Sequence, residues 1–220
     1  MSAYLDRIDR KFSLMDVELV DRLSAASRTE EADLQGILSG TLVDTRPMNA
    51  VTFVENHDTQ DGQQLGPPVL PWFKPLAYAL VLLRGDGYPC VFYGDLYGIS
   101  GPGAEFTTGP SCGGQLPDFI LARKLYAYGE EVSYFDFRTC VGWVRQGTWD
   151  HKDGCAVVMS NAGAGWKRMY VGTLHHGEVW TDVVFLRLFG IDVNHSLGGV
   201  IKRLRLGMMG TENFTVMRLR

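Results

Sequence analysis

Five polar side chains follow one another directly after an apolar run, and residues of these types could carry out chemistry. The run covers 50–54, and it is followed by Glu55, Asn56, His57, Asp58 and Thr59. A buried strand that delivers such groups at its carboxyl end is typical of the ligand-binding face of an α/β barrel. An ionised aspartate accepts two hydroxyl donors at once, and an imidazole can donate to a third.

The same residues also fit a purely structural interpretation. Asp58-Thr59 and Asp61-Gly62 are ordinary turn formers, so the pattern alone is equally typical of a strand end followed by an Asx-type turn.

Residues 53–60 resemble the seventh-strand motif of the α-amylase superfamily, glycoside hydrolase family 13. The likeness runs from Tyr4 to about Asp182 and is greatest to the liquefying-type α-amylases of bacteria and their intracellular fungal relatives. The resemblance implies that Asp58 stabilises the transition state and that His57 holds the sugar. The resemblance places Asn56 with His57 among the substrate-binding residues, where it would orient this pair; alternatively it merely closes the strand.

Two further segments resemble barrel strands of that family, and they suggest how the chain is organised. Residues 13–17 resemble its sixth strand, and 87–95 resemble the Gly-x-Pro-x-x-Phe-Tyr-Gly-Asp block of its eighth, in which Asp95 is mainly structural. We therefore expect 1–131 to be the C-terminal part of a (β/α)8 barrel, about strands six to eight. An antiparallel β-sandwich domain would occupy 132–185, and 186–220 would be a divergent tail.

Apolar patterning and turn residues predict the individual elements. We expect barrel strands over 13–17, 50–54 and 88–93, a polar loop over 24–31, and helices over 32–38, 72–84 and 116–129. In the sandwich we expect strands over 139–145, 155–160, 167–171 and 178–184.

The family's nucleophile and general acid lie on its fourth and fifth strands, and nothing before residue 13 resembles either segment. A complete barrel needs eight strands and roughly 250 residues. The resemblance thus implies an α-amylase-type retaining hydrolase of α-1,4-glucan of which this chain holds a partial active site, inactive on its own. The alternative is a non-catalytic glucan-binding or non-functional remnant of such an enzyme.

The sequence predicts no cofactor in this chain. The family uses calcium, which is bound mainly by upstream segments. A further calcium site of liquefying amylases uses aspartates that align near Thr139 and Asn161. Calcium affinity rises with the number of charged oxygen ligands, so we expect that site to be lost.

Composition narrows the range of partners and locations. The 220-residue chain has a formal net charge of −4, which argues against a nucleic-acid partner. No apolar run is long enough to span a bilayer, and no secretory h-region follows Met1, so we expect a cytoplasmic location and no membrane partner. The resemblance to the α-amylase superfamily, and not the composition, implies an α-glucan substrate as the ligand. A barrel fragment would also leave open sheet edges, which favour self-association.

The four cysteines form no CxxC pair, which argues against a zinc ribbon or a thioredoxin-type site. Cys90 lies in an apolar run and is expected to be buried. Cys140 and Cys155 flank an Asp153-Gly154 turn, where pairing across a hairpin is conceivable.

Overall fold

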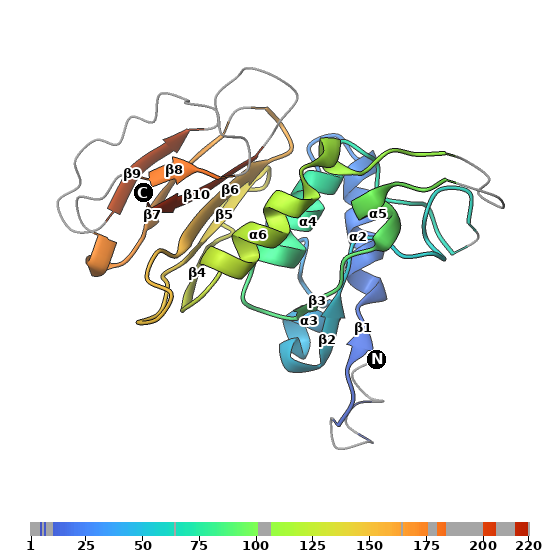
Figure 1. The fold of residues 1–220 in the computed structure, drawn as a ribbon, viewed down its shortest axis with the longest axis horizontal. Coiled ribbons are helices and arrows are strands. Elements are labelled where there is room, and N and C mark those ends of the chain that lie inside the picture. Colours follow the sequence, from blue (N-terminus) through green and yellow to red (C-terminus); the bar gives the residue numbers. More distant parts are fainter. Residues whose placement is uncertain are drawn as a thin grey trace. The chain divides into compact units, whose positions relative to one another are not determined.

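A computed structural model describes residues 5, 7, 11–63, 65–100, 107–163, 165–175, 180–183, 200–205 and 214–219 (Figure 1). The chain divides into two compact units. Unit one comprises Met1–Thr29, Gly36–Leu82 and Asp86–Pro117, and unit two comprises Glu30–Gln35, Leu83–Gly85 and Asp118–Arg220. The division into 1–131, 132–185 and 186–220 stays a prediction.

Unit one contains a parallel sheet in the order β1-β2-β3, formed by β1 (Leu14–Met15), β2 (Ala50–Thr52) and β3 (Tyr88–Pro89). The strands alternate with helices along the chain, as in a doubly covered parallel sheet (Figure 1). The helical elements are α2 (Val17–Arg28), α3 (Leu42–Thr45), η1 (Pro47–Asn49), α4 (Lys74–Leu83), α5 (Tyr93–Tyr97) and η2 (Cys112–Gly114). The described strands form an open sheet rather than a closed barrel.

Three expectations for unit one need correction. The polar loop expected over 24–31 is largely helical, because α2 continues to Arg28. The strand expected over 88–93 ends at Pro89, although the N–H of Cys90 still donates to the carbonyl of Thr52 at 2.7 Å, and the chain turns into α5 at Tyr93. Cys90 is exposed, not buried. β3 lies at the edge of the sheet and so lacks cover on one side, and Tyr88 is 74% exposed there.

Asp16 is the buried polar residue that connects β1 to its surroundings. Its Oδ1 accepts hydrogen bonds from the backbone N–H of Leu19, at the start of α2, and of Leu42, in α3, both at 3.2 Å. Its Oδ2 accepts from the N–H of Val43 at 2.7 Å, and its own N–H donates to the carbonyl of Val51 in β2. The side chain is 0% exposed, so these amides have no access to solvent as an alternative partner.

Replacing Asp16 with alanine is therefore expected to lower the free energy of unfolding by about 2–4 kcal/mol, since several buried amides lose a charged acceptor. Urea unfolding measures this change. Asp21→Ala, at an exposed position on the same helix, is the matched control and should stay within about 0.5 kcal/mol of the parent. A loss as small as the control's would contradict this role of Asp16.

The expected self-association through open edges stays a prediction. Within the described residues β1 and β3 each pair with β2 alone, so each leaves backbone groups unpaired along its other side. We expect size-exclusion chromatography to show oligomers of chain 1–220. A monodisperse monomer with one sharp thermal transition would contradict this prediction.

Unit two is built on antiparallel strands. The main sheet has the order β4-β5-β6-β10-β8, and β7 pairs with β9 in a second sheet. The elements are α6 (Leu116–Tyr126), which leads in from unit one, then β4 (Glu131–Tyr134), β5 (Cys140–Arg145), β6 (Cys155–Ser160), β7 (Trp166–Tyr170), η3 (Thr173–His175), β8 (Trp180–Asp182), β9 (Val200–Arg205) and β10 (Phe214–Leu219). Val144, Val158 and Met169 belong to one buried cluster, so the two sheets share a core.

Several expectations for unit two can be compared directly with these strands. The range 155–160 coincides with β6, and the other three expected strands overlap β5, β7 and β8. No helix forms over 32–38, where the carboxylate of Asp33 accepts from the N–H of Gln35 and stabilises a turn instead. Two strands, β9 and β10, lie in the range assigned to a divergent tail. Residues 178–179 and 184 of the strand expected over 178–184 lie outside the described residues.

Cys140 and Cys155, for which pairing across a hairpin was conceivable, do not form a disulfide. Cys140 pairs in register with Ser160 and Cys155 with Arg145, which places the two thiols at opposite ends of the β5–β6 ladder. All four cysteines are free.

Candidate functional site

The polar residues after β2 form a turn that is held by Asn56. Its Oδ1 accepts from the backbone N–H of Asp58 at 2.9 Å and of Thr59 at 3.0 Å. The backbone N–H of Asn56 in turn donates to Oγ1 of Thr59 at 3.0 Å. The Asx-type turn that the residue types suggested is therefore present, and it fixes the backbone that carries His57 and Asp58.

His57 and Asp58 lie on the carboxyl side of β2 and close to each other. Nε2 of His57 is 3.5 Å from Oδ1 of Asp58, and the side chains are 80% and 49% exposed. Both groups are thus accessible to a ligand in the described part of the chain. Their roles in substrate binding and catalysis stay predictions.

A buried cluster of charged side chains includes Glu55, the residue that directly precedes this turn. No local sequence pattern predicted this cluster. Nζ of Lys74, at the start of α4, lies 2.7 Å from Oε2 of Glu55 and 2.6 Å from Oδ1 of Asp95, and it donates to Oγ of Ser111 at 3.3 Å. Oδ2 of Asp95 accepts from the hydroxyl of Tyr78 at 2.6 Å. Glu55 directly precedes Asn56, so the contact with Lys74 holds the residue at the start of the turn.

Glu55 is a buried carboxyl group of this cluster whose pKa is raised. Only 4% of the residue is exposed, and burial raises the pKa of its carboxyl from 4.5 to about 7, although the nearby ammonium of Lys74 acts in the opposite direction. Oε1 of Glu55 has no hydrogen-bond partner within the described residues. The carboxylate form is stabilised at one oxygen only.

This shift predicts how stability depends on pH. Between about pH 4.5 and 7 the folded chain binds more protons at Glu55 than the unfolded chain does, so the free energy of unfolding falls as pH rises through this window. Urea midpoints at pH 5 and pH 8 measure the fall. In Glu55→Gln it should be smaller than in the parent, and an unchanged fall would contradict the assignment.

A cavity of about 400 Å³ in unit one adjoins the cluster. Glu55, Asp61, Lys74, Asp95 and Ser111 are among its lining residues, whereas His57 and Asp58 are not. Its walls include apolar residues, among them Pro68, Val69, Leu70, Pro71, Ile99 and Pro110. We call it the Glu55 cavity.

The thiol of Cys112 also lines the Glu55 cavity. Burial raises the pKa of this thiol to about 12, so Cys112 is protonated at neutral pH and is a poor nucleophile.

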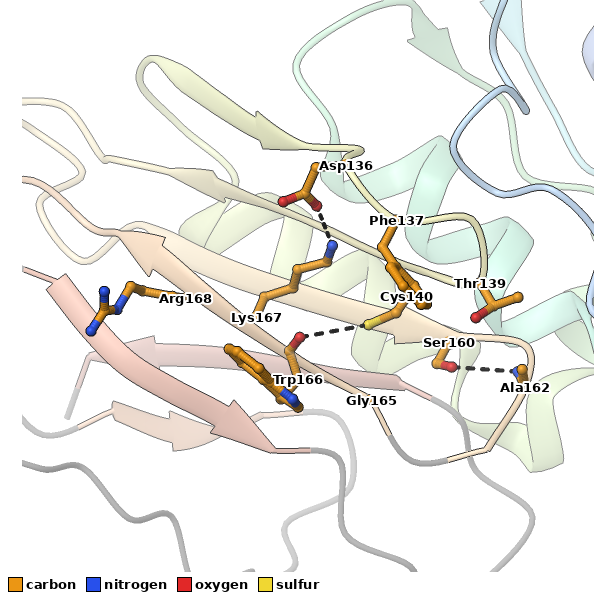
Figure 2. A pocket seen from close by; sticks show the side chains of 10 residues that line it. All are labelled: Asp136, Phe137, Thr139, Cys140, Ser160, Ala162, Gly165, Trp166, Lys167 and Arg168. Carbon is orange, nitrogen blue, oxygen red and sulfur yellow. Dashed lines mark hydrogen bonds and ion pairs between the residues drawn. The ribbon is translucent and has the colours of Figure 1, made fainter.

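A second cavity, of about 530 Å³, lies in unit two (Figure 2). Lys167 on β7 forms an ion pair there with Asp136, and the thiol of Cys140 faces the carbonyl of Trp166 at 4.0 Å. Thr139 lines the same cavity. The sequence analysis made no prediction for this cavity.

The donor groups near the aligned calcium position do not fit calcium. Neither Asn161 nor Thr139 supplies a carboxylate. Asn161 is 9% exposed and its Nδ2 donates to the carbonyl of Ala32 at 2.8 Å, while its Oδ1 has no hydrogen-bond partner within the described residues. The described residues contain no group of three His, Cys, Asp or Glu side chains that could hold a metal ion. The expected loss of this calcium site and the expected absence of a cofactor both stay predictions.

Within the described part of the chain, no helix has the length and apolar character needed to cross a bilayer.

Comparison with known proteins shows which enzymes the chain is related to. No family profile matches it. The chain is 43% identical over 188 residues to the cytoplasmic α-amylase of Escherichia coli (strain K12), covering 83% of this chain and 38% of that enzyme. It is 42% identical over 193 residues to the α-amylase of Bacillus licheniformis, covering 87% of this chain and 37% of that enzyme.

Solved structures agree with the fold. A cyclomaltodextrin glucanotransferase, CldA, aligns with a TM-score of 0.66 at 20% identity, covering 95% of this chain and 45% of that one. An α-amylase from Eisenia fetida aligns with a TM-score of 0.62 at 12% identity, covering 93% of this chain and 48% of that one. The chain is a homologue of the α-amylases, glycoside hydrolase family 13, and it corresponds to a segment of about 37% of their full length.

Proposed function

We propose that this chain is the C-terminal part of an α-amylase-type retaining glycoside hydrolase that acts on α-1,4-glucan, and that Asp58 stabilises its transition state. His57 and Asn56 bind the substrate. The nucleophile and the general acid belong to the part of the α-amylases that the chain does not match, so the chain alone is inactive. A cytoplasmic location is part of the proposal, by similarity to the cytoplasmic α-amylase of Escherichia coli.

The observation that carries this proposal is the identity of 42–43% to two α-amylases over more than four-fifths of the chain. The turn after β2 supports it independently. Asn56 holds the backbone of Asp58 in place, and both Asp58 and His57 have exposed side chains on the carboxyl side of a parallel strand. That is the face on which α/β barrels bind their ligands.

The chemistry assigns a separate task to each group. Retaining cleavage requires a carboxylate nucleophile and a carboxylic acid that protonates the leaving oxygen, and it passes through an oxocarbenium-like state. A further carboxylate that accepts sugar hydroxyls lowers the barrier if its hydrogen bonds strengthen in that state. Asp58 suits this task, because both its oxygens can accept. His57 lies 3.5 Å away and can donate to a neighbouring hydroxyl.

Fusion with the missing part tests the proposal. The upstream segment of the Escherichia coli cytoplasmic α-amylase, up to the start of the matched region, would be joined to this chain. The fusion should release reducing ends from starch and not from a β-1,4-glucan, because the substrate-binding residues are those of an α-glucan enzyme. A folded fusion without activity on starch would favour the alternative, a non-catalytic remnant.

A further inference from the structure

The Glu55 cavity combines apolar walls with a polar floor, which is the composition of a small-molecule site. Its volume of about 400 Å³ lies within the usual range of ligand pockets, roughly 300–1,000 Å³. The walls include Val69, Leu70 and Ile99, and the polar groups of the lining include Glu55 and Ser111. All of these residues belong to unit one.

Most polar atoms at the floor already have partners. The ammonium of Lys74 has three hydrogens, and Glu55, Asp95 and Ser111 each accept one. Asp95 accepts at Oδ1 from Lys74 and Ser111, and at Oδ2 from Tyr78. None of the polar atoms named here lacks a hydrogen-bond partner.

Oε1 of Glu55 is the exception among the floor atoms described above. It is buried and has no hydrogen-bond partner within the described residues, although the residue lines the cavity and is only 4% exposed. An unsatisfied buried acceptor is costly, and the cost is removed when a donor enters. The cavity therefore favours a ligand that brings a hydrogen-bond donor to this oxygen.

The charges at the cavity narrow the class of ligand. Three carboxyl groups, Glu55, Asp61 and Asp95, face two cations, Arg28 and Lys74, in the lining. Both cations already donate hydrogen bonds to oxygens of the protein, so the lining does not favour a phosphate or a sulfate. A metal ion is disfavoured because the ammonium of Lys74 already lies between two of these carboxylates. A neutral sugar fits both features, since its hydroxyls can donate to Glu55 and its apolar ring faces can pack on the walls.

We infer that the Glu55 cavity is a binding site for one glucose unit of an α-glucan, with a sugar hydroxyl donating to Oε1 of Glu55. This inference rests on the proposed function, which supplies the α-glucan. It adds a contact apart from Asp58 and His57, which do not line the cavity. The site would bind a glucose unit of the substrate that lies at a distance from the glycosidic bond being cleaved.

Two substitutions test the site by different routes. Glu55→Gln keeps the shape of the side chain but removes its charge. Gly109→Leu adds bulk at the lining of the cavity and leaves the residues of the charge cluster unchanged. The backbone tolerates a side chain there, because a Cβ at Gly109 meets nothing within 4 Å and its φ is not in the left-handed region. Gly109→Ala and Glu30→Gln, an exposed carboxylate elsewhere, are the matched controls.

Equilibrium dialysis of chain 1–220 with radiolabelled maltotriose gives the affinity whether or not the chain forms oligomers. We expect Glu55→Gln and Gly109→Leu each to weaken binding about tenfold or more, and both controls to stay within about twofold. If thermal melting shows that Glu55→Gln does not fold, the maltotriose affinity of Gly109→Leu decides whether the inference stands. Absence of maltotriose binding by the parent, or unchanged affinity in folded Gly109→Leu, overturns the inference.

The outcome is separable from that of the proposed function. Hydrolysis of starch by the fusion tests the proposed function without reference to the cavity. An active fusion together with a chain whose maltotriose affinity is insensitive to Gly109→Leu would reject the cavity alone. An inactive fusion with sensitive binding would reject the catalytic proposal alone.

Discussion

Replacing Lys74 with methionine is expected to lower the free energy of unfolding by about 3–5 kcal/mol at pH 8. Methionine keeps much of the length of the side chain but removes the ammonium that lies 2.7 Å from Glu55 and 2.6 Å from Asp95. Both carboxyl groups are 3% exposed at the side chain, so two like charges would remain buried without a cation. Urea unfolding at one fixed chain concentration measures the loss.

The pH dependence of this loss provides an internal check. Because the pKa of Glu55 is already raised to about 7, its carboxyl takes up a proton readily below that pH. The loss in Lys74→Met should therefore be smaller at pH 5 than at pH 8. The double variant Lys74→Met/Glu55→Gln should recover part of the stability at pH 8. A loss below about 1 kcal/mol at pH 8 would show that the cluster contributes little.

Replacing Asp58 with asparagine is expected to lower kcat of the starch-cleaving fusion by roughly 10²–10³-fold or more, with a smaller change in KM. The reason is that the proposed role of Asp58 is stabilisation of the transition state rather than of the bound substrate. Its side chain is 49% exposed, so the fold should be unaffected. Steady-state kinetics on soluble starch measures both constants.

The control for this variant is Asp21→Asn, at an exposed aspartate on α2. Its kcat should match that of the parent fusion. A fusion carrying Asp58→Asn that retains most of its kcat would contradict the assignment of Asp58, and equal thermal melting of the two variants would exclude misfolding as the cause of any loss.

The elements that the sequence predicted well have strong local signals. β6 follows from an apolar run between turn residues at 154 and 161–165. The turn after β2 was predicted from Asp58-Thr59, although the side chain that closes it is that of Asn56. The strand over 88–93 was too long because a short apolar run does not by itself distinguish a buried strand from the start of a helix, and α5 begins at Tyr93. α2 was not predicted as a helix, and its last residues were assigned to a polar loop because serines such as Ser24 and Ser27 have weak helical preference.

The charge cluster could not be predicted, because its members are far apart in the sequence. Lys74 meets Glu55 across 19 positions, Asp95 across 21 and Ser111 across 37. No periodicity joins such residues, and only the packing of α4 and α5 beside the β2 turn brings them together. The one available signal was Glu55, a carboxylate placed directly after a buried strand.

The tail illustrates the same limit in unit two. β10 forms its ladder with β6, and the pair Phe214 and Met159 is separated by more than fifty positions. Its sequence is rich in apolar residues and is compatible with a strand, but the loss of family likeness favoured a divergent tail. A long-range strand partner, not the local pattern, determines the structure there.

Starch hydrolysis by purified chain 1–220, compared with the fusion, tests most directly the claim that this chain holds one part of an α-amylase active site. The chain alone should release no reducing ends above background, because the nucleophile and the general acid are supplied by the upstream segment. The fusion should release them and should lose that activity in Asp58→Asn. Hydrolysis by the chain alone that survives Asp58→Asn would contradict the claim and point to other carboxylates.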